Sequence, residues 1–114
     1  MPDAPMDLVK GTLDLMILRT LAWAPNHGYG ISRWIEHCTD DALRVEEGSL
    51  YPALYRLEER GMIASDWGTT ETGRRARIYR LTTQGKRHLK ESMTRWDRFS
   101  VALTKVLTTQ PASV

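Results

Sequence analysis

Residues 47–61 constrain the fold most narrowly, because the run EGSLYPALYRLEERG predicts a short helix with both ends marked. Ser49 is the expected N-cap, since its hydroxyl can accept a hydrogen bond from a free N–H of the first turn. Pro52 would then take the third helical position, where the N–H it lacks would have no partner. Gly61 suits the left-handed residue that closes a helix. The leucines at helical spacing predict a buried face: Leu50, Leu54 and Leu57.

The opposite face of this predicted helix is polar and aromatic. It carries Ser49, Tyr51, Tyr55 and Arg56. Tyrosine hydroxyls and a guanidinium near the positive end of a helix suit an anionic partner such as DNA. Taken alone, the helix leaves an alternative open, in which the tyrosines are half-buried and the charges are simply solvated.

The charge of the chain is unevenly distributed. The 114 residues are those of one domain, and a net charge of +2 does not by itself indicate nucleic-acid binding. However, residues 36–47 carry five acids against one arginine, whereas residues 74–80 carry four arginines and no acid. Twelve of the 16 basic residues are arginine, which favours bidentate contacts with phosphates and base edges.

The sequence predicts no metal site, no cofactor and no enzymatic activity. Cys38 is the only cysteine, so an internal disulfide is excluded and a reducing compartment is indicated. We expect it to be an inert thiol on the inward side of its helix. The histidines His27, His37 and His88 do not combine with it at ligand spacing. With no signal-peptide pattern and no apolar span, we expect a protein located in the cytoplasm.

Periodicity predicts the order of the elements. Residues 1–8 are expected to be loose. Three helices are expected in the first half of the chain, at residues 9–24, 29–38 and 50–60. The second of these helices should turn Ile31, Trp34, Ile35 and Cys38 inward. Alternation then predicts a hairpin of two strands, residues 62–67 and 75–81, joined by a turn at 68–73.

A long last helix, capped by Thr82 and running to about residue 107, has a broad apolar stripe. Because three helices and a hairpin already supply a core, this stripe needs a partner surface, most simply a second copy of the chain. The predicted interface residues on this helix are Leu89, Met93, Trp96, Leu103 and Leu107. Trp96 is either an anchor of that interface or, with Phe99, a stacking surface for a planar aromatic ligand.

This order of elements is that of a winged helix-turn-helix with an added helix, in which the third helix enters the major groove. The expected fold class is mainly α with a small β-hairpin, the wing. The expected domains are a DNA-binding domain (residues 1–81), a dimerisation helix (82–107) and a disordered tail (108–114).

Four stretches resemble the PadR family of bacterial transcriptional regulators: LDLMIL at 13–18, HGYGI at 27–31, residues 47–61, and GRRARIYRLTTQG at 73–85. The similarity extends over about residues 9–107. It implies a homodimeric repressor of a palindromic operator. It also implies that the last helix packs against the first helix of the partner chain, which adds Leu13 and Ile17 to the predicted interface. Some members of the family sense phenolic acids or flat hydrophobic drugs in the dimer interface.

The candidate DNA contacts come from three elements. They are Tyr29 at the start of the second helix, Ser49, Tyr51, Tyr55 and Arg56 on the third, and Arg74, Arg75 and Arg77 on the wing. Two functions remain: a DNA-binding repressor with double-stranded DNA as partner, and a winged-helix module that binds other proteins through its tyrosines. The density of arginine on the wing favours DNA.

Overall fold

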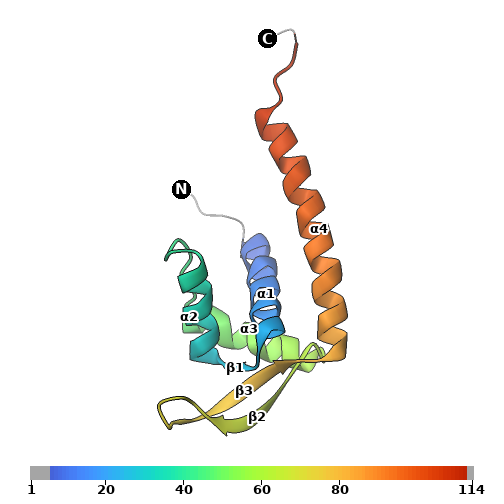
Figure 1. The fold of residues 1–114 in the computed structure, drawn as a ribbon. Coiled ribbons are helices and arrows are strands. Elements are labelled where there is room, and N and C mark those ends of the chain that lie inside the picture. The colour runs from blue at the N-terminus through green and yellow to red at the C-terminus, as the bar shows by residue number, and fades with distance from the viewer. Residues whose placement is uncertain (1–5, 113–114) are drawn as a thin grey trace.

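The computed structural model describes residues 6–112, and their side chains from residue 11 onward. Figure 1 shows a mainly helical chain with a small sheet at one end, as predicted. In chain order the elements are α1 (Met6–Trp23), β1 (Asn26–His27), α2 (Gly28–Cys38), α3 (Glu47–Glu59), β2 (Ile63–Thr69), β3 (Arg75–Leu81) and α4 (Thr83–Thr108). The first helix therefore begins earlier than predicted, since residues 6–8 are helical; residues 1–5 lie outside the described part.

The sheet has one strand more than predicted. β3 is central and pairs antiparallel with β2, from Ile63 opposite Leu81 to Thr69 opposite Arg75. On its other side β3 pairs with β1, where Asn26 lies opposite Tyr79. Two residues are too few for an alternating pattern, so the sequence predicts only a break at 25–28. The strand β1 forms because its two residues pair with the free edge of β3.

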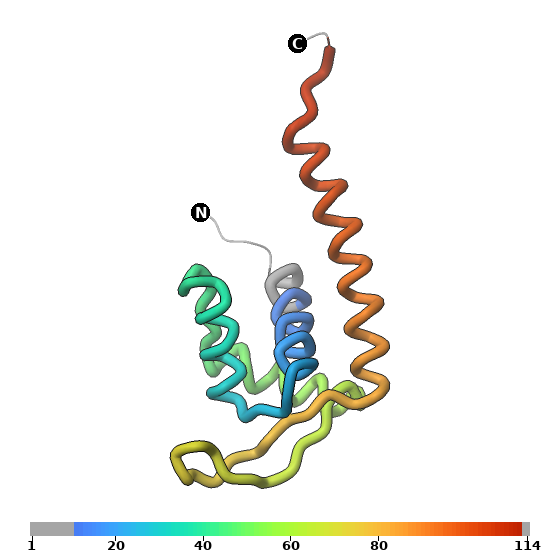
Figure 2. The backbone as a smooth tube through the Cα atoms, in the orientation of Figure 1, coloured from blue at the N-terminus to red at the C-terminus, as the bar shows by residue number. Residues whose placement is uncertain are grey.

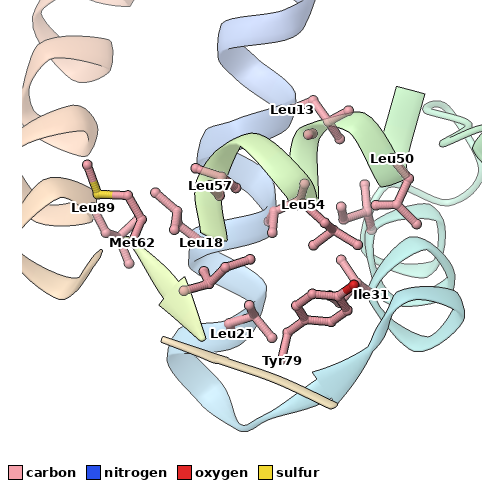
Figure 3. Packing of buried hydrophobic residues seen from close by; sticks show 14 residues of the cluster. Leu13, Leu18, Leu21, Ile31, Leu50, Leu54, Leu57, Met62, Tyr79 and Leu89 are labelled. Carbon is pink, nitrogen blue, oxygen red and sulfur yellow. The ribbon is translucent and has the colours of Figure 1, made fainter. Parts of the chain in front are cut away.

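The core lies between α1, α2, α3 and the sheet, and Figure 3 shows its side chains converging from all of them. The predicted buried face of α3 is confirmed, because Leu50, Leu54 and Leu57 are each 1% exposed. The buried hydrophobic side chains are Leu13, Ile17, Leu18, Leu21, Ile31, Ile35, Leu50, Ala53, Leu54, Leu57, Met62, Ile63, Tyr79 and Leu89.

The inward face of α2 is narrower than predicted. Ile31 and Ile35 are buried, as expected. Trp34 is 45% exposed and Cys38 is exposed, so the prediction of inward positions for these two was wrong. Both lie at the edge of the buried strip at 100° per residue, and α2 ends at Cys38. Cys38 is therefore a surface thiol and not a core one.

The N-terminus of α3 was also predicted wrongly. The cap residue is Glu46, whose side chain makes no capping hydrogen bond, and Ser49 already lies inside the first turn. With Glu47 as the first helical residue, Pro52 lies inside the helix. Because proline has no N–H, the Gly48 carbonyl receives no hydrogen bond from residue 52.

The C-terminus of α3 is closed as predicted. Gly61 has a φ of 76°, in the left-handed region. The N–H of Gly61 donates to the Glu58 carbonyl at 3.0 Å and that of Met62 to the Leu57 carbonyl at 2.9 Å. This pair of bonds is the Schellman motif, and it turns the chain directly from α3 into β2.

Thr82 caps α4, as predicted, and ties its first turn to the corner between α3 and β2. Its hydroxyl accepts from the Gly85 N–H at 3.0 Å and lies 2.7 Å from the Gly61 carbonyl oxygen, to which it donates. Its own N–H donates to the Met62 carbonyl at 3.1 Å. These bonds fix the direction in which the 26-residue helix leaves the body.

The second half of α4 extends beyond the body. Figure 2 shows α4 passing beside α1 and continuing past its far end. The radius of gyration is 16.6 Å, against about 13 Å for a compact chain of this length. The predicted tail begins one residue later than expected, because Thr108 belongs to α4, and residues 113–114 lie outside the described part.

Three residues of the predicted interface belong instead to the chain's own core. Leu13, Ile17 and Leu89 are 7%, 0% and 5% exposed, because α1 and the start of α4 pack on the body. These three side chains are therefore buried within the single chain, and their contact with a second chain stays a prediction. The remaining four are exposed and lie farther along α4: Met93, Trp96, Leu103 and Leu107.

Candidate nucleic-acid interface

A groove runs between the first turn of α2, the side of α3 and the wing, which is the β2–β3 hairpin. We call it the wing groove; its volume is about 750 Å³. Five of the eight predicted DNA contacts line it: Tyr29, Tyr51, Arg74, Arg75 and Arg77. The other lining residues are His27, Gly28, Trp67, Thr70, Glu71, Thr72, Ala76 and Tyr79. Residues far apart in the sequence are thus brought to one concave surface.

Tyr51 reaches the start of α2 because residue 28 is glycine. A Cβ at Gly28 would lie 2.8 Å from the Tyr51 hydroxyl oxygen, closer than side chains tolerate. His27 caps the helix there by accepting from the Gly30 N–H through Nδ1 at 3.1 Å. The Tyr51 hydroxyl and the positive end of α2 therefore lie together, an arrangement that suits one phosphate group.

The wing arginines are held by neighbours that the sequence did not reveal. The guanidinium of Arg75 lies 4.8 Å and that of Arg77 5.4 Å from the centre of the Trp67 ring. Arg77 also donates to the Ser65 hydroxyl at 2.8 Å and lies 3.7 Å from Glu58. This stacking holds both cations along one face of the wing and relieves their mutual repulsion.

The other two wing arginines differ in their surroundings. Arg80 pairs with Asp66 at 3.0 Å, so its charge is balanced on the wing itself. Within the described part of the chain, Arg74 forms no ion pair, and its side chain lines the wing groove. Arg74 is therefore the wing cation most available to a phosphate.

The tip of the wing is tied to the start of α2. Glu71 lies 3.5 Å from Nε2 of His27. The pKa of Glu71 is below its usual range because its own backbone N–H and then the His27 side chain donate to the carboxylate. This contact lies at the wing tip, and both residues line the wing groove.

The outward face of α3 presents Tyr55, which is 66% exposed. Its hydroxyl donates to Glu59 at 3.2 Å, and this bond to a carboxylate raises the pKa of Tyr55. The hydroxyl thus stays protonated at neutral pH, and its single hydrogen is directed to Glu59. Ser49 is exposed near the helix N-terminus, but it leaves α3 about 120° from Tyr55 and lines a separate pocket with Leu13, Leu15 and Met16 of α1.

Arg56 is not brought into the wing groove. Its guanidinium donates to Asp14 of α1 at 3.1 Å. Five positions separate it from Tyr51, so the two side chains leave α3 about 140° apart. Burial raises the pKa of Asp14, and the nearby Arg56 opposes that rise.

A second groove, the α1–α4 groove, contains the predicted ligand residues. The Trp96 and Phe99 rings are 5.7 Å apart, centre to centre, and tilted by 36°. The groove has a volume of about 420 Å³. Its other lining residues are Gly11, Thr12, Asp14, Leu15, Leu18, Arg60, His88, Ser92 and Arg95. Cationic and aromatic side chains therefore share one concave surface.

The family comparison agrees with this geometry. The model of the transcriptional regulator PadR-like family matches residues 17–91, which include α2, α3 and the wing. The chain belongs to this family. A protein of Lysinibacillus sphaericus is 33% identical to it over 90 residues, covering 79% of this chain and 83% of that one.

Solved structures of transcriptional regulators share the whole PadR-like architecture. A regulator from Clostridium thermocellum matches with a TM-score of 0.79 and 34% identity, covering 87% of this chain and 96% of that one. A PadR family regulator from Eggerthella lenta matches with a TM-score of 0.75 and 30% identity, covering 92% and 89%. The chain is thus a PadR-like transcriptional regulator, a class of DNA-binding proteins.

Several residues of the PadR-like site were not found from the sequence. Trp67 is expected on a strand without a role, and no role is expected for Glu58. His27 was considered as a metal ligand and as part of the stretch that resembles the family, but not as the cap of α2. In the described part, no group of three potential metal ligands is present and no helix is long and apolar enough to span a membrane.

Proposed function

We propose that this PadR-like regulator is a homodimeric repressor that binds a palindromic operator. The observation that carries the proposal is the wing groove, where the Tyr51 hydroxyl, the positive end of α2 and the Arg74 guanidinium meet. Phosphate is the ligand that this combination of donors and cations suits best.

Each element has a separate task in this proposal. Tyr29 and Tyr51 donate to phosphate oxygens beside the start of α2. Ser49 and Tyr55 enter the major groove with α3, where hydroxyl groups contact base edges or phosphates. The wing follows the DNA backbone, with Arg74 nearest to phosphate and the cations stacked on Trp67 beside it: Arg75 and Arg77.

The second copy of the chain is proposed to cover α4. Along its outer half, Trp96, Leu103 and Leu107 are 42%, 43% and 73% exposed, and the helix extends past the body. An apolar stripe of this length is unfavourable in water unless a partner covers it. In a two-fold symmetric dimer, each chain covers the stripe of the other. A dimer of this kind presents two copies of α3, which is why the operator is expected to be palindromic.

The test of the function is selection from a pool of random duplex DNA, followed by sequencing of the bound fraction. We expect enrichment of an inverted repeat whose half-sites lie one helical turn apart, about 10 base pairs. No enrichment, together with capture of a protein partner that Tyr51→Ala abolishes, would replace DNA by a protein as the partner.

Arg74→Ala is expected to weaken specific and non-specific DNA binding in the same ratio, because Arg74 lies on the wing and contacts phosphate. The slope of log K against log salt should become shallower by roughly 0.9 for each chain. Arg98→Ala removes the same charge from an exposed position on α4, and it should leave the affinity and the salt slope unchanged. Fluorescence anisotropy with the selected operator and a scrambled duplex measures both. A loss confined to the operator would instead assign Arg74 to base reading.

A planar aromatic effector is proposed to bind in the α1–α4 groove and to release the DNA. Trp96 should then report binding, because a ring stacked on it quenches its fluorescence. Titration with planar aromatic compounds should quench the wild type but not Trp96→Phe, while Trp34→Phe should keep the response. Quenching that persists in Trp96→Phe would contradict this assignment. Release of operator in the same titration tests the coupling.

A further inference from the structure

Arg56 lies on the DNA-facing helix but bonds within the protein. It donates to Asp14 of α1 at 3.1 Å, across the junction of α1 and α3. The Arg56 side chain remains 38% exposed and that of Asp14 is 21% exposed. An ion pair this open to water is weak, so a phosphate of bound DNA can compete with it.

Other basic side chains lie around Asp14. Arg60 of the α3 C-cap and His88 of α4 are near this carboxylate. Arg56 is the one of the three that donates a hydrogen bond to it. Asp14 also lines the α1–α4 groove, so it lies between that groove and α3.

We propose that Asp14 competes with DNA phosphate for the guanidinium of Arg56. In the free protein Asp14 holds Arg56 back, and this lowers the affinity for DNA of any sequence. On the operator, where α3 is seated in the major groove, the phosphate takes Arg56 from Asp14. This inference rests on the proposed DNA-binding function, and it makes Asp14 a positioning residue that raises the selectivity for the operator.

The test is the neutral, isosteric variant Asp14→Asn, measured on a scrambled duplex over a range of salt concentrations. We expect binding at least threefold tighter at low salt. The slope of log K against log salt should become steeper by roughly 0.9 for each chain, because one more phosphate is neutralised. The double variant Asp14→Asn/Arg56→Gln should lose both changes, which shows that they act through Arg56.

A control variant separates this contact from net charge. Asp40→Asn makes the same change of charge in the loop between α2 and α3, where residue 40 is exposed and has a φ of 51° that asparagine tolerates. It should leave the salt slope unchanged. An equal gain in both variants would overturn the proposal, and so would weaker binding by Asp14→Asn.

Arg56→Gln alone gives an independent test that does not need Asp14 to be altered. Because Asp14 holds this guanidinium in the wild type, its loss should change affinity for the scrambled duplex less than twofold, whereas Arg74→Ala should weaken it clearly. A large loss would overturn the proposal. If the wild type bound no DNA, the proposed function itself would fail; wild-type binding without the Asp14→Asn gain would remove only this inference.

Discussion

Gly85→Ala is expected to destabilise the fold by about 3 kcal/mol, at the upper end of what an added methylene costs in a packed region. The added Cβ would collide with the carbonyl oxygen of Met62, which is backbone, and would lie 2.8 Å from Leu81 Cδ1. Relief requires the first turn of α4 to move away from β2. That movement would break the bonds of Thr82 to Gly61 and Met62.

The matched control is Gly48→Ala, also a helical glycine. A Cβ at Gly48 meets nothing within 4 Å, so alanine should stabilise α3 by about 0.5–1 kcal/mol through its better helix propensity. Urea unfolding followed by circular dichroism, at one protein concentration, measures both variants. Equal stabilities for wild type and Gly85→Ala would show that α4 is not seated on the α3–β2 corner.

Leu103→Glu is expected to convert the proposed dimer into monomers. Leu103 is 43% exposed in the single chain, midway along the outer half of α4. Burying a leucine side chain stabilises a dimer by about 1.5–3 kcal/mol. Because the dimer is two-fold symmetric, the substitution removes this contribution from both chains and places two carboxylates in the interface. Light scattering should show the mass falling from twice 13.0 kDa to that of one chain.

The control for Leu103→Glu is Val101→Glu on the same helix. Val101 is 49% exposed, against 43% for Leu103. Because the two residues are two positions apart, their side chains point to opposite sides of α4. The same change there should leave the mass unaltered, and affinity for an inverted repeat should fall only for Leu103→Glu. Monomers from both variants, or from neither, would remove this stripe from the interface. A proline at position 103 should release monomers too, by interrupting α4.

The sequence was a good guide wherever a signal is local. Leucine spacing located the buried face of α3, Gly61 its closing turn, and Thr82 the cap of α4, because each depends on a few consecutive residues. It was a poor guide where a neighbour decides. Ser49 has the chemistry of an N-cap, yet α3 begins at Glu47, and the N–H groups of Ser49 and Leu50 donate to the Glu46 carbonyl.

The candidate site shows the same division. The sequence alone determined which residues carry hydroxyls and cations, and that α3 and the wing flank one another in the chain. Only the tertiary structure decided that Tyr51 meets α2 at Gly28, that Arg56 turns to Asp14, and that Leu13 is buried by its own chain. The physical reason is that periodicity gives the face of an element, whereas contacts depend on which element covers that face.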